Sequence, residues 1–167
     1  MAITSAVCNS FKQEILEAEH NFTASTGNTF NLALYDSDAT LNKSTTAYTT
    51  SEELATTGGY SAKGNALTSV TPVLDSDTAV CDFSNSSWTS ASFTARGCLI
   101  FNDSHSSDAA VCAIDFGGDK TVTSGTFTVE FPAAAASTAA GRWFRWRRPR
   151  ASPGRRTRRR RPHTQRR

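Results

Sequence analysis

Three histidines, His20, His105 and His163, are the residues from which a catalytic mechanism would have to start. His105 directly follows Asp103 and Ser104, so the three residue types of a hydrolase triad stand in a row. Adjacent residues cannot point toward one another as nucleophile, base and orienting acid, and nothing nearby supplies an oxyanion hole. We therefore expect a solvated turn here, with no catalytic residue and no enzymatic activity in the chain.

The carboxylates could serve either acid–base chemistry or metal binding. Glu52 and Glu53 are neighbours that would point to opposite faces of a strand, which does not support paired-carboxylate chemistry. Carboxylates near predicted turns can bind calcium, but their spacing here is not that of an EF-hand or a repeat. We expect ordinary turn residues, with no bound metal and no cofactor. The aspartates concerned are Asp75, Asp77, Asp103, Asp108, Asp115 and Asp119.

Four cysteines, Cys8, Cys81, Cys98 and Cys112, form no CxxC pair and no Cys/His cluster, so we expect no structural zinc site. An even number of cysteines in a secreted protein would allow two disulfides, with three possible pairings. The first residues lack a basic segment, and glutamates interrupt any apolar run, which does not match an export signal. We expect synthesis in a reducing cytosol and four free thiols, most of them buried on strands.

Aromatic residues allow two interpretations, a ligand-stacking platform or a packed core. They recur with period two inside predicted strands, which favours core packing, because alternate residues of a strand share one face. The aromatic residues concerned are Trp88, Phe93, Phe101, Phe116, Phe127 and Phe131.

The elements that would position these residues begin with one helix. Apolar residues recur at helical spacing between polar ones, which predicts an amphipathic helix near the start of the chain. Its polar face is acidic, the wrong sign for anionic lipid, and no apolar run approaches the length needed to span a bilayer, so we expect no membrane contact. The apolar stripe is Ile3, Val7, Phe11, Ile15 and Leu16.

From residue 29 onward the apolar period changes to two, and short strand patterns alternate with turn signals, among them Asp75-Ser76-Asp77, which predicts a hairpin. The long polar stretch 36–64 is expected to be a surface excursion with at most one short strand. Gly117-Gly118-Asp119-Lys120 lacks the spacing of a phosphate-binding loop and is expected to be a hairpin turn. We therefore expect an antiparallel β-sandwich or jelly-roll-like domain, because a sheet with one apolar face must bury that face against another layer. The predicted strands span residues 29–35, 66–73, 78–83, 88–101 (bent near Arg96-Gly97), 110–116 and 121–131.

Charge divides the chain into two parts. Residues 1–140 hold all 15 acidic groups and five basic ones, 5 − 15 = −10, whereas residues 141–167 hold 13 arginines and no acidic group. A polycation interrupted by prolines cannot pack a core. We therefore expect a β-domain at residues 1–132, followed by an Ala-rich and then Arg-rich disordered tail at residues 133–167.

The origin of this tail has two interpretations. Arginines neutralise phosphates, and Trp143, Phe144 and Trp146 could stack on bases, which would make the tail a nucleic-acid-binding arm. The abrupt change from Ala-rich sequence to Arg, Pro, Gly and Trp is also what reading a GC-rich gene out of frame produces. We favour a frameshifted end.

Several segments in succession resemble a family of small virion structural proteins of tailed bacteriophages, common in marine phages. They are ITSAVCNSFKQEIL, TFNLALYDSDATLNKSTTAYTT, SSWTSASFTARGCLIFND and AVCAIDFGGDKTVTSGTFTVEFP, and the resemblance covers about residues 1–132. It implies assembly into the particle, in a capsid-decoration or tail-associated role, and no catalytic residues. Family members continue past the FP element with a short apolar segment, whereas Pro132 is followed here by alanines, which agrees with the frameshift interpretation.

The expected function is therefore that of a non-enzymatic virion structural protein, made in the host cytoplasm. Its expected partners are other virion proteins in multiple copies, and it would touch nucleic acid only through the Arg-rich tail. A module that binds host-surface carbohydrate is the alternative. An assembly protein should occur in many symmetric copies and lack a stacked aromatic site, which separates the two hypotheses.

Overall fold

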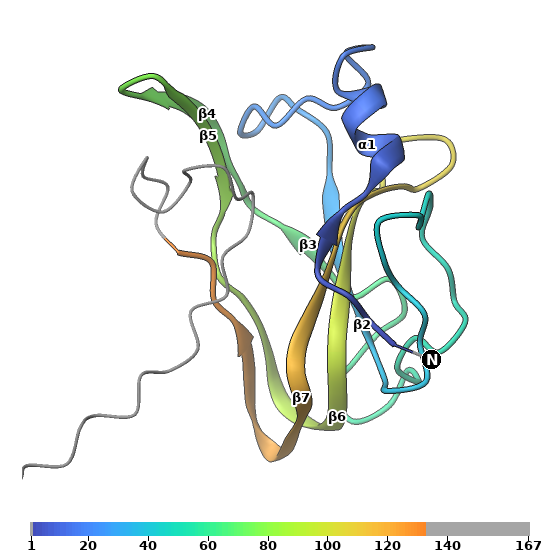
Figure 1. The fold of residues 1–167 in the computed structure, drawn as a ribbon. Coiled ribbons are helices and arrows are strands. Elements are labelled where there is room, and N and C mark those ends of the chain that lie inside the picture. Colours follow the sequence, from blue (N-terminus) through green and yellow to red (C-terminus); the bar gives the residue numbers. More distant parts are fainter. Residues whose placement is uncertain (1, 133–167) are drawn as a thin grey trace, which may run out of the picture.

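A computed structural model describes residues 2–132, and the predictions for residues 133–167 lie outside this range. The described chain is mainly β, and all its strand pairs are antiparallel, which confirms the coarse fold prediction. Five strands form one sheet in the order β1-β7-β6-β2-β3, and β4 and β5 form a second, two-stranded sheet (Figure 1). The elements are β1 (Ala6–Val7), α1 (Asn9–Glu14), β2 (Phe30–Tyr35), β3 (Asn65–Leu67), β4 (Ser69–Asp75), β5 (Thr78–Phe83), β6 (Ser86–Asn102) and β7 (Ala109–Val129).

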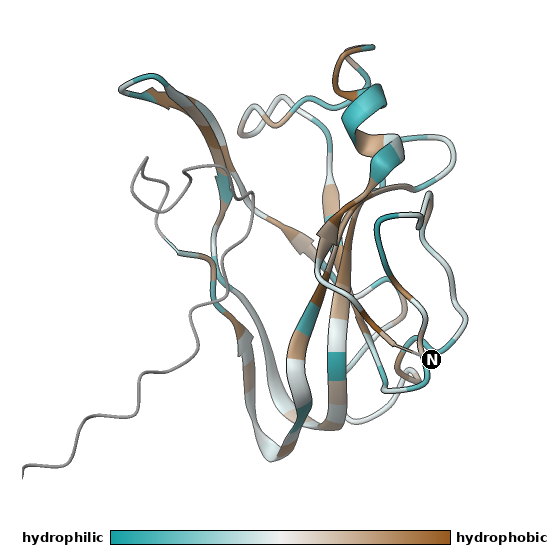
Figure 2. Cartoon of the chain, viewed as in Figure 1, coloured by the Kyte–Doolittle hydropathy of each residue, from teal (hydrophilic) through white to brown (hydrophobic). Residues whose placement is uncertain are grey.

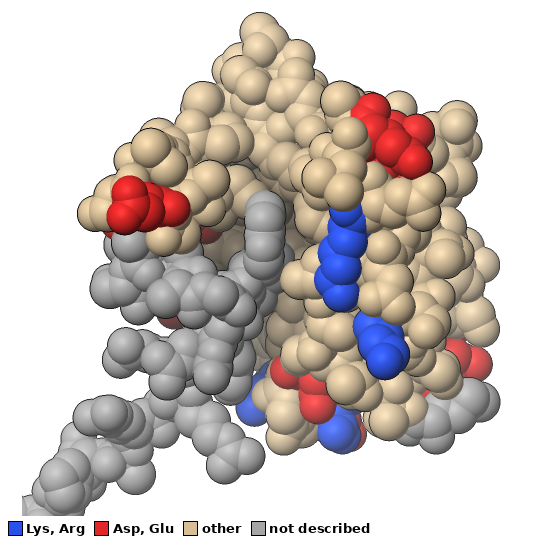
Figure 3. Space-filling view, turned by 45° about the horizontal axis from the view of Figure 1, so that its top comes forward, with Lys and Arg blue, Asp and Glu red and all other residues tan. Residues whose placement is uncertain are grey.

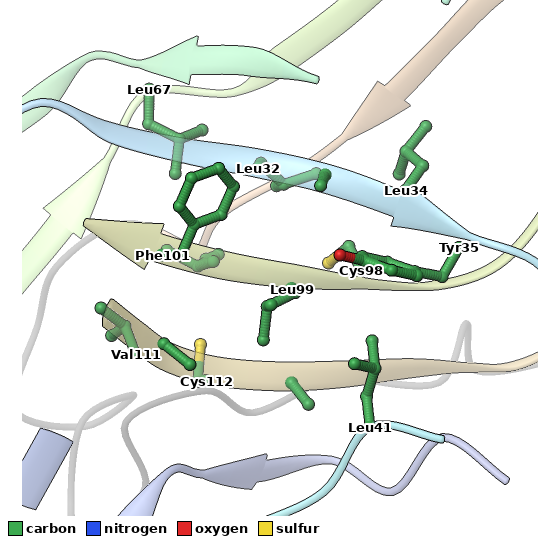
Figure 4. Close-up of a cluster of buried hydrophobic side chains, with 14 of the residues drawn as sticks. Leu32, Leu34, Tyr35, Leu41, Leu67, Cys98, Leu99, Phe101, Val111 and Cys112 are labelled. Carbon is green, nitrogen blue, oxygen red and sulfur yellow. The ribbon is translucent and has the colours of Figure 1, made fainter. Parts of the chain in front are cut away.

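Strand β2 lies at the centre of the core. Its alternation predicts one apolar face, yet all six of its residues are buried, because β3 and β6 flank it and the loop 36–64 covers it. Tyr35 Oη donates to the Thr49 carbonyl at 2.6 Å, and the Leu54 N–H donates to the Leu34 carbonyl at 3.0 Å. The expected surface excursion thus packs on the sheet. Figure 4 shows loop residue Leu41 beside side chains from β2, β6 and β7.

Strands β6 and β7 form one long, bent hairpin (Figure 1). The bend lies near Gly97, as expected, where an added Cβ would come within 2.5 Å of the Ile114 carbonyl oxygen. The expected hairpin turn at residues 117–119 is wrong, because β7 continues through it as a bulge between the pairs Ala95↔Lys120 and Gly97↔Asp115. Positive φ angles at two glycines of this bulge bend the strand without reversing it, and β6 remains paired on both sides.

The bent hairpin folds back on itself and brings its aromatic side chains together. The rings of Phe116 and Phe127, both on β7, have centroids 6.1 Å apart, and Trp88 and Phe93 of β6 contact Tyr60 of the loop. Trp88, Phe101 and Phe116 are buried, and Phe93, Phe127 and Phe131 pack against the same core. The prediction of core packing for the aromatic residues is confirmed.

The N-terminal helix is shorter than its apolar spacing predicts. Val7 belongs to β1 and pairs with Cys112 of β7, and the Cys8 N–H donates to the Val111 carbonyl at 2.9 Å. The residues expected to form the first helical turn therefore pair as a strand with the open edge of β7. Phe11 is buried, whereas Leu16 lies beyond the helix and is 87% exposed. Within residues 2–132 no helix is long and apolar enough to cross a membrane.

Candidate functional site

The triad-like residues Asp103, Ser104 and His105 lie in the turn between β6 and β7 and bind three different partners. Asp103 accepts a hydrogen bond from Lys63 Nζ at 2.8 Å. Ser104 Oγ accepts one from the backbone N–H of Thr29 at 2.8 Å. His105 Nε2 lies 2.7 Å from the carboxylate oxygen Oε2 of Glu19. The three side chains do not converge, so this turn serves to join segments of the chain.

Glu53 is the centre of a partly buried polar cluster. Its Oε1 accepts from Tyr60 Oη at 2.6 Å and from the Lys63 N–H at 2.7 Å, and its Oε2 accepts from Tyr48 Oη. Burial, followed by the hydrogen bond to Glu53, raises the pKa of Tyr48 to about 12 and raises that of Tyr60 as well. The neighbouring Glu52 is exposed, so the two carboxylates point apart, as the sequence suggests.

Lys63 connects this Glu53 cluster to the β6–β7 turn. Its Nζ lies 2.8 Å from Asp103 Oδ1 and 2.9 Å from Asp108 Oδ2, and these hydrogen-bonded carboxylates raise the pKa of the ammonium group. The same nitrogen lies 5.6 Å from the ring centroid of Tyr48 and 5.9 Å from that of Phe101, within cation–π range. The sequence does not reveal this connection, because Lys63 and Asp108 are 45 residues apart.

The six aspartates considered for calcium do not form one cluster. Asp103 and Asp108 bind Lys63, and Asp115 and Asp119 bind Arg96 beside the β7 bulge. The other two lie at the turn of the β4–β5 hairpin. Elsewhere in the described chain, ligand atoms of Asp36, Asp38 and Glu52 lie within 4.8 Å of one another. This largely exposed group was not predicted, since only the Asp36–Asp38 spacing is visible in the sequence.

The four cysteines are free thiols, as expected from the sequence. Cys8, Cys98 and Cys112 are buried, and Cys81 is partly exposed. Burial raises the pKa of Cys8 and of Cys81 to about 11, and it raises that of the two more deeply buried thiols as well. A thiol with a raised pKa stays protonated at neutral pH and is a poor nucleophile.

Strands β4 and β5 form an arm that leaves the body of the protein (Figure 1). This arm, residues 69–83, is paired to no strand of the five-stranded sheet. The strand pattern expected at residues 66–73 divides between β3 and β4, which belong to different sheets, while the predicted hairpin turn after it is confirmed. The register shifts around Pro72, which lacks an N–H group and is tolerated at such a bulge.

Exposed aliphatic side chains distinguish the arm from the rest of the described chain. Leu74 is 72% exposed, Val73 52% and Val70 41%, and Leu16 is the one other large hydrophobic residue of residues 2–132 that is comparably exposed. Val73 and Leu74 are neighbours on a strand, so both faces of the arm present apolar surface. Figure 2 shows the hydrophobic residues along the arm, and most of the face drawn in Figure 3 is uncharged.

An exposed two-stranded arm is suited to contact with another protein chain. Its outer edges carry backbone groups that a further strand could pair with, and its aliphatic side chains would lose water on contact. Comparison of the chain with family models, curated proteins and solved structures gives no match.

Proposed function

We propose that this chain is a non-enzymatic structural protein of a tailed-bacteriophage particle, which assembles through the β4–β5 arm with neighbouring copies of itself. The arm carries this proposal, because Val73 and Leu74 expose aliphatic surface on both of its faces. The resemblance of residues 1–132 to small virion structural proteins supports the particle as the place of assembly. It also selects a second copy as the partner, since such proteins act in many copies.

The proposal extends to the finer fold class, an antiparallel sandwich related to jelly rolls and preceded by an amphipathic helical segment. The ring contact between Phe116 and Phe127 supports this, because it places the two halves of one bent strand across a shared core. Sandwiches pack two inner faces around such a core. An experimental structure of the assembled particle would test the fold class together with the capsid or tail location.

The test of the arm is the double substitution Val73→Ser with Leu74→Ser. Losing two buried aliphatic side chains from a contact should weaken self-association by about 3 kcal/mol, roughly 100-fold in Kd. Light scattering after size-exclusion chromatography, over a range of concentrations, gives the Kd of the full chain. The free energy of unfolding should change little, because both side chains are already exposed to water in the single chain.

Leu16→Ser is the matched control, since Leu16 is 87% exposed and lies outside the arm. It should leave self-association unchanged. Equal effects of the arm and control variants would contradict the role of the arm. A wild-type chain that stays monomeric and binds a host-surface glycan would favour the carbohydrate-binding alternative, and mass spectrometry of purified particles would show whether the chain is a component.

A further inference from the structure

Two histidines from distant parts of the chain stack where the segment after α1 meets the β6–β7 turn. The ring centroids of His20 and His105 are 6.3 Å apart, and the planes are inclined by 24°. His20 is buried, and its Nε2 lies 2.9 Å from Oε2 of Glu14. His105 Nε2 makes the corresponding contact with Glu19 Oε2 at 2.7 Å. Each ring therefore faces a carboxylate through Nε2.

The other nitrogen of His20 faces a group that can only donate. Asn102 is fully buried, and its Oδ1 accepts a hydrogen bond from the Ser104 N–H at 3.1 Å. Its amide nitrogen Nδ2 therefore points toward His20 Nδ1, at 3.1 Å. Since an amide NH₂ has no acceptor, His20 Nδ1 must be unprotonated. The geometry defines a neutral His20 that carries its proton on Nε2.

His105 is held in the same tautomer but less strictly. The backbone N–H of Ser107 donates to His105 Nδ1 at 3.3 Å, while the Ser107 hydroxyl lies 2.9 Å from the same nitrogen. A hydroxyl can turn to accept from a protonated Nδ1. A second proton on His105 Nδ1 therefore requires only rotation of this exposed hydroxyl and a shift of the Ser107 N–H, whereas one on His20 Nδ1 requires the buried Asn102 amide to turn over.

We propose that His20, His105 and Asn102 form an acid-sensitive latch that holds the turn 103–108 against the segment 14–22, closed while His20 is neutral. A proton on His20 Nδ1 would place an N–H against the Asn102 NH₂ group. The amide must then turn over to present Oδ1, and the Ser104 N–H loses its acceptor. The turn loosens, because one of the hydrogen bonds that define it is broken.

Charged groups on both sides determine where the change occurs. Glu14 and Glu19 face the rings through Nε2 and would attract an imidazolium, so they keep both rings in place as they become charged. On the other side, Lys63 is paired with Asp103 and Asp108 and anchors the ends of the turn. We therefore expect the change to occur at Asn102 and in the backbone of the turn, and a protonated His105 would add a second positive ring beside His20.

The first test needs no variant. In the full chain labelled with ¹⁵N-histidine, NMR at about pH 7.5 should show His20 and His105 in the Nε2–H tautomer, and spectra recorded at lower pH report when each ring has taken up its second proton. Amide exchange in residues 103–108, relative to amides of β2, should then rise several-fold. An Nδ1–H tautomer of His20 at the higher pH, or an unchanged exchange ratio, would overturn the latch.

Asn102→Asp is the informative variant, because a carboxylate oxygen replaces the donating NH₂ group at nearly constant shape. That oxygen can accept from a protonated His20 Nδ1 while the other keeps the Ser104 N–H. The exchange ratio should then be the same at both pH values. His105→Gln should keep the acid response, and its loss there would assign the switch to His105 and contradict the role of His20. If Asn102→Asp does not fold, the tautomer measurement still decides.

Discussion

Replacing Glu53 by alanine should be among the most destabilising substitutions of a charged residue in this protein. Glu53 accepts hydrogen bonds from Tyr60 Oη, the Lys63 N–H and Tyr48 Oη. Tyr60 is only 2% exposed, so its hydroxyl cannot replace the carboxylate with bulk water. The substitution leaves all three donors without this acceptor, and an unsatisfied buried donor costs about 1–3 kcal/mol. The expected loss is about 3–4 kcal/mol of unfolding free energy.

Glu53→Gln separates the loss of charge from the loss of the acceptor. The amide oxygen of glutamine can still accept from Tyr60 and from the Lys63 N–H, and the Tyr48 hydroxyl can rotate to accept from the new NH₂ group. We expect a loss of about 1 kcal/mol, the difference between a charge-assisted and a neutral hydrogen bond. Urea unfolding, monitored by circular dichroism, measures the free energy of unfolding of both variants. We expect the slope of this free energy against urea concentration to stay unchanged.

Tyrosine titration gives an independent readout of the same contacts. Burial and the hydrogen bond to Glu53 raise the pKa of Tyr48 to about 12 from its ordinary value of 10.0, and the pKa of Tyr60 is raised too. These tyrosines stay protonated in the folded chain when the unfolded chain has ionised. Their contribution to stability is therefore complete below about pH 10 and is lost as the pH rises further. Glu53→Gln should shift their ultraviolet titration to lower pH.

Glu52→Ala is the control, because Glu52 is an adjacent, exposed glutamate. Its unfolding free energy should stay within about 0.5 kcal/mol of the wild type. If Glu53→Ala costs no more than Glu52→Ala, the carboxylate is not satisfying buried donors and the argument for the cluster fails.

Three further predictions concern the thiols, one glycine and the tail. Burial raises the pKa of Cys81 to about 11 from 9.0, so the free energy of unfolding should begin to fall above about pH 9. Thiol titration in denaturant without reductant should find four reactive groups, and finding none would mean two disulfides. Gly64→Ala should lower the free energy of unfolding by about 2 kcal/mol, because φ is +65° and an added Cβ would come within 1.8 Å of the Leu32 carbonyl oxygen. Gly125→Ala is the control, since φ is not positive there, and it should cost less in the same urea unfolding experiment. Removing residues 141–167 changes the formal net charge from +3 to −10 and should abolish salt-sensitive DNA binding, and binding that persists would locate it in the body.

Local patterns in the sequence were enough to predict much of the sheet. Period-two alternation places Phe30, Leu32 and Leu34 on one buried face, and the aromatic residues of β6 and β7 lie in the core as their spacing predicts. The turn after Asp75 and the bend near Gly97 also agree with the structure. These features depend on residues close together in the chain, so local pattern and turn chemistry suffice to predict them.

The misassigned elements have tertiary causes. Gly117 and Gly118 would suit a hairpin turn, but the continuous partner strand β6 makes them a bulge. Val7 has helical spacing with Phe11, yet the free edge of β7 recruits it as a strand. In each case hydrogen bonds to a distant strand outweigh a local preference of about 1 kcal/mol or less.

By itself, the sequence determined the β-rich class, the free thiols, the aromatic core and the separation of an acidic body from a basic tail. Only the tertiary structure decided that Glu53 collects three donors, that His20 stacks on His105, and that residues 69–83 stand apart as an exposed arm. Composition and periodicity report which residues prefer burial or a given local conformation. They do not report which residues 40 or more positions apart meet, because that depends on how the whole chain closes around one core.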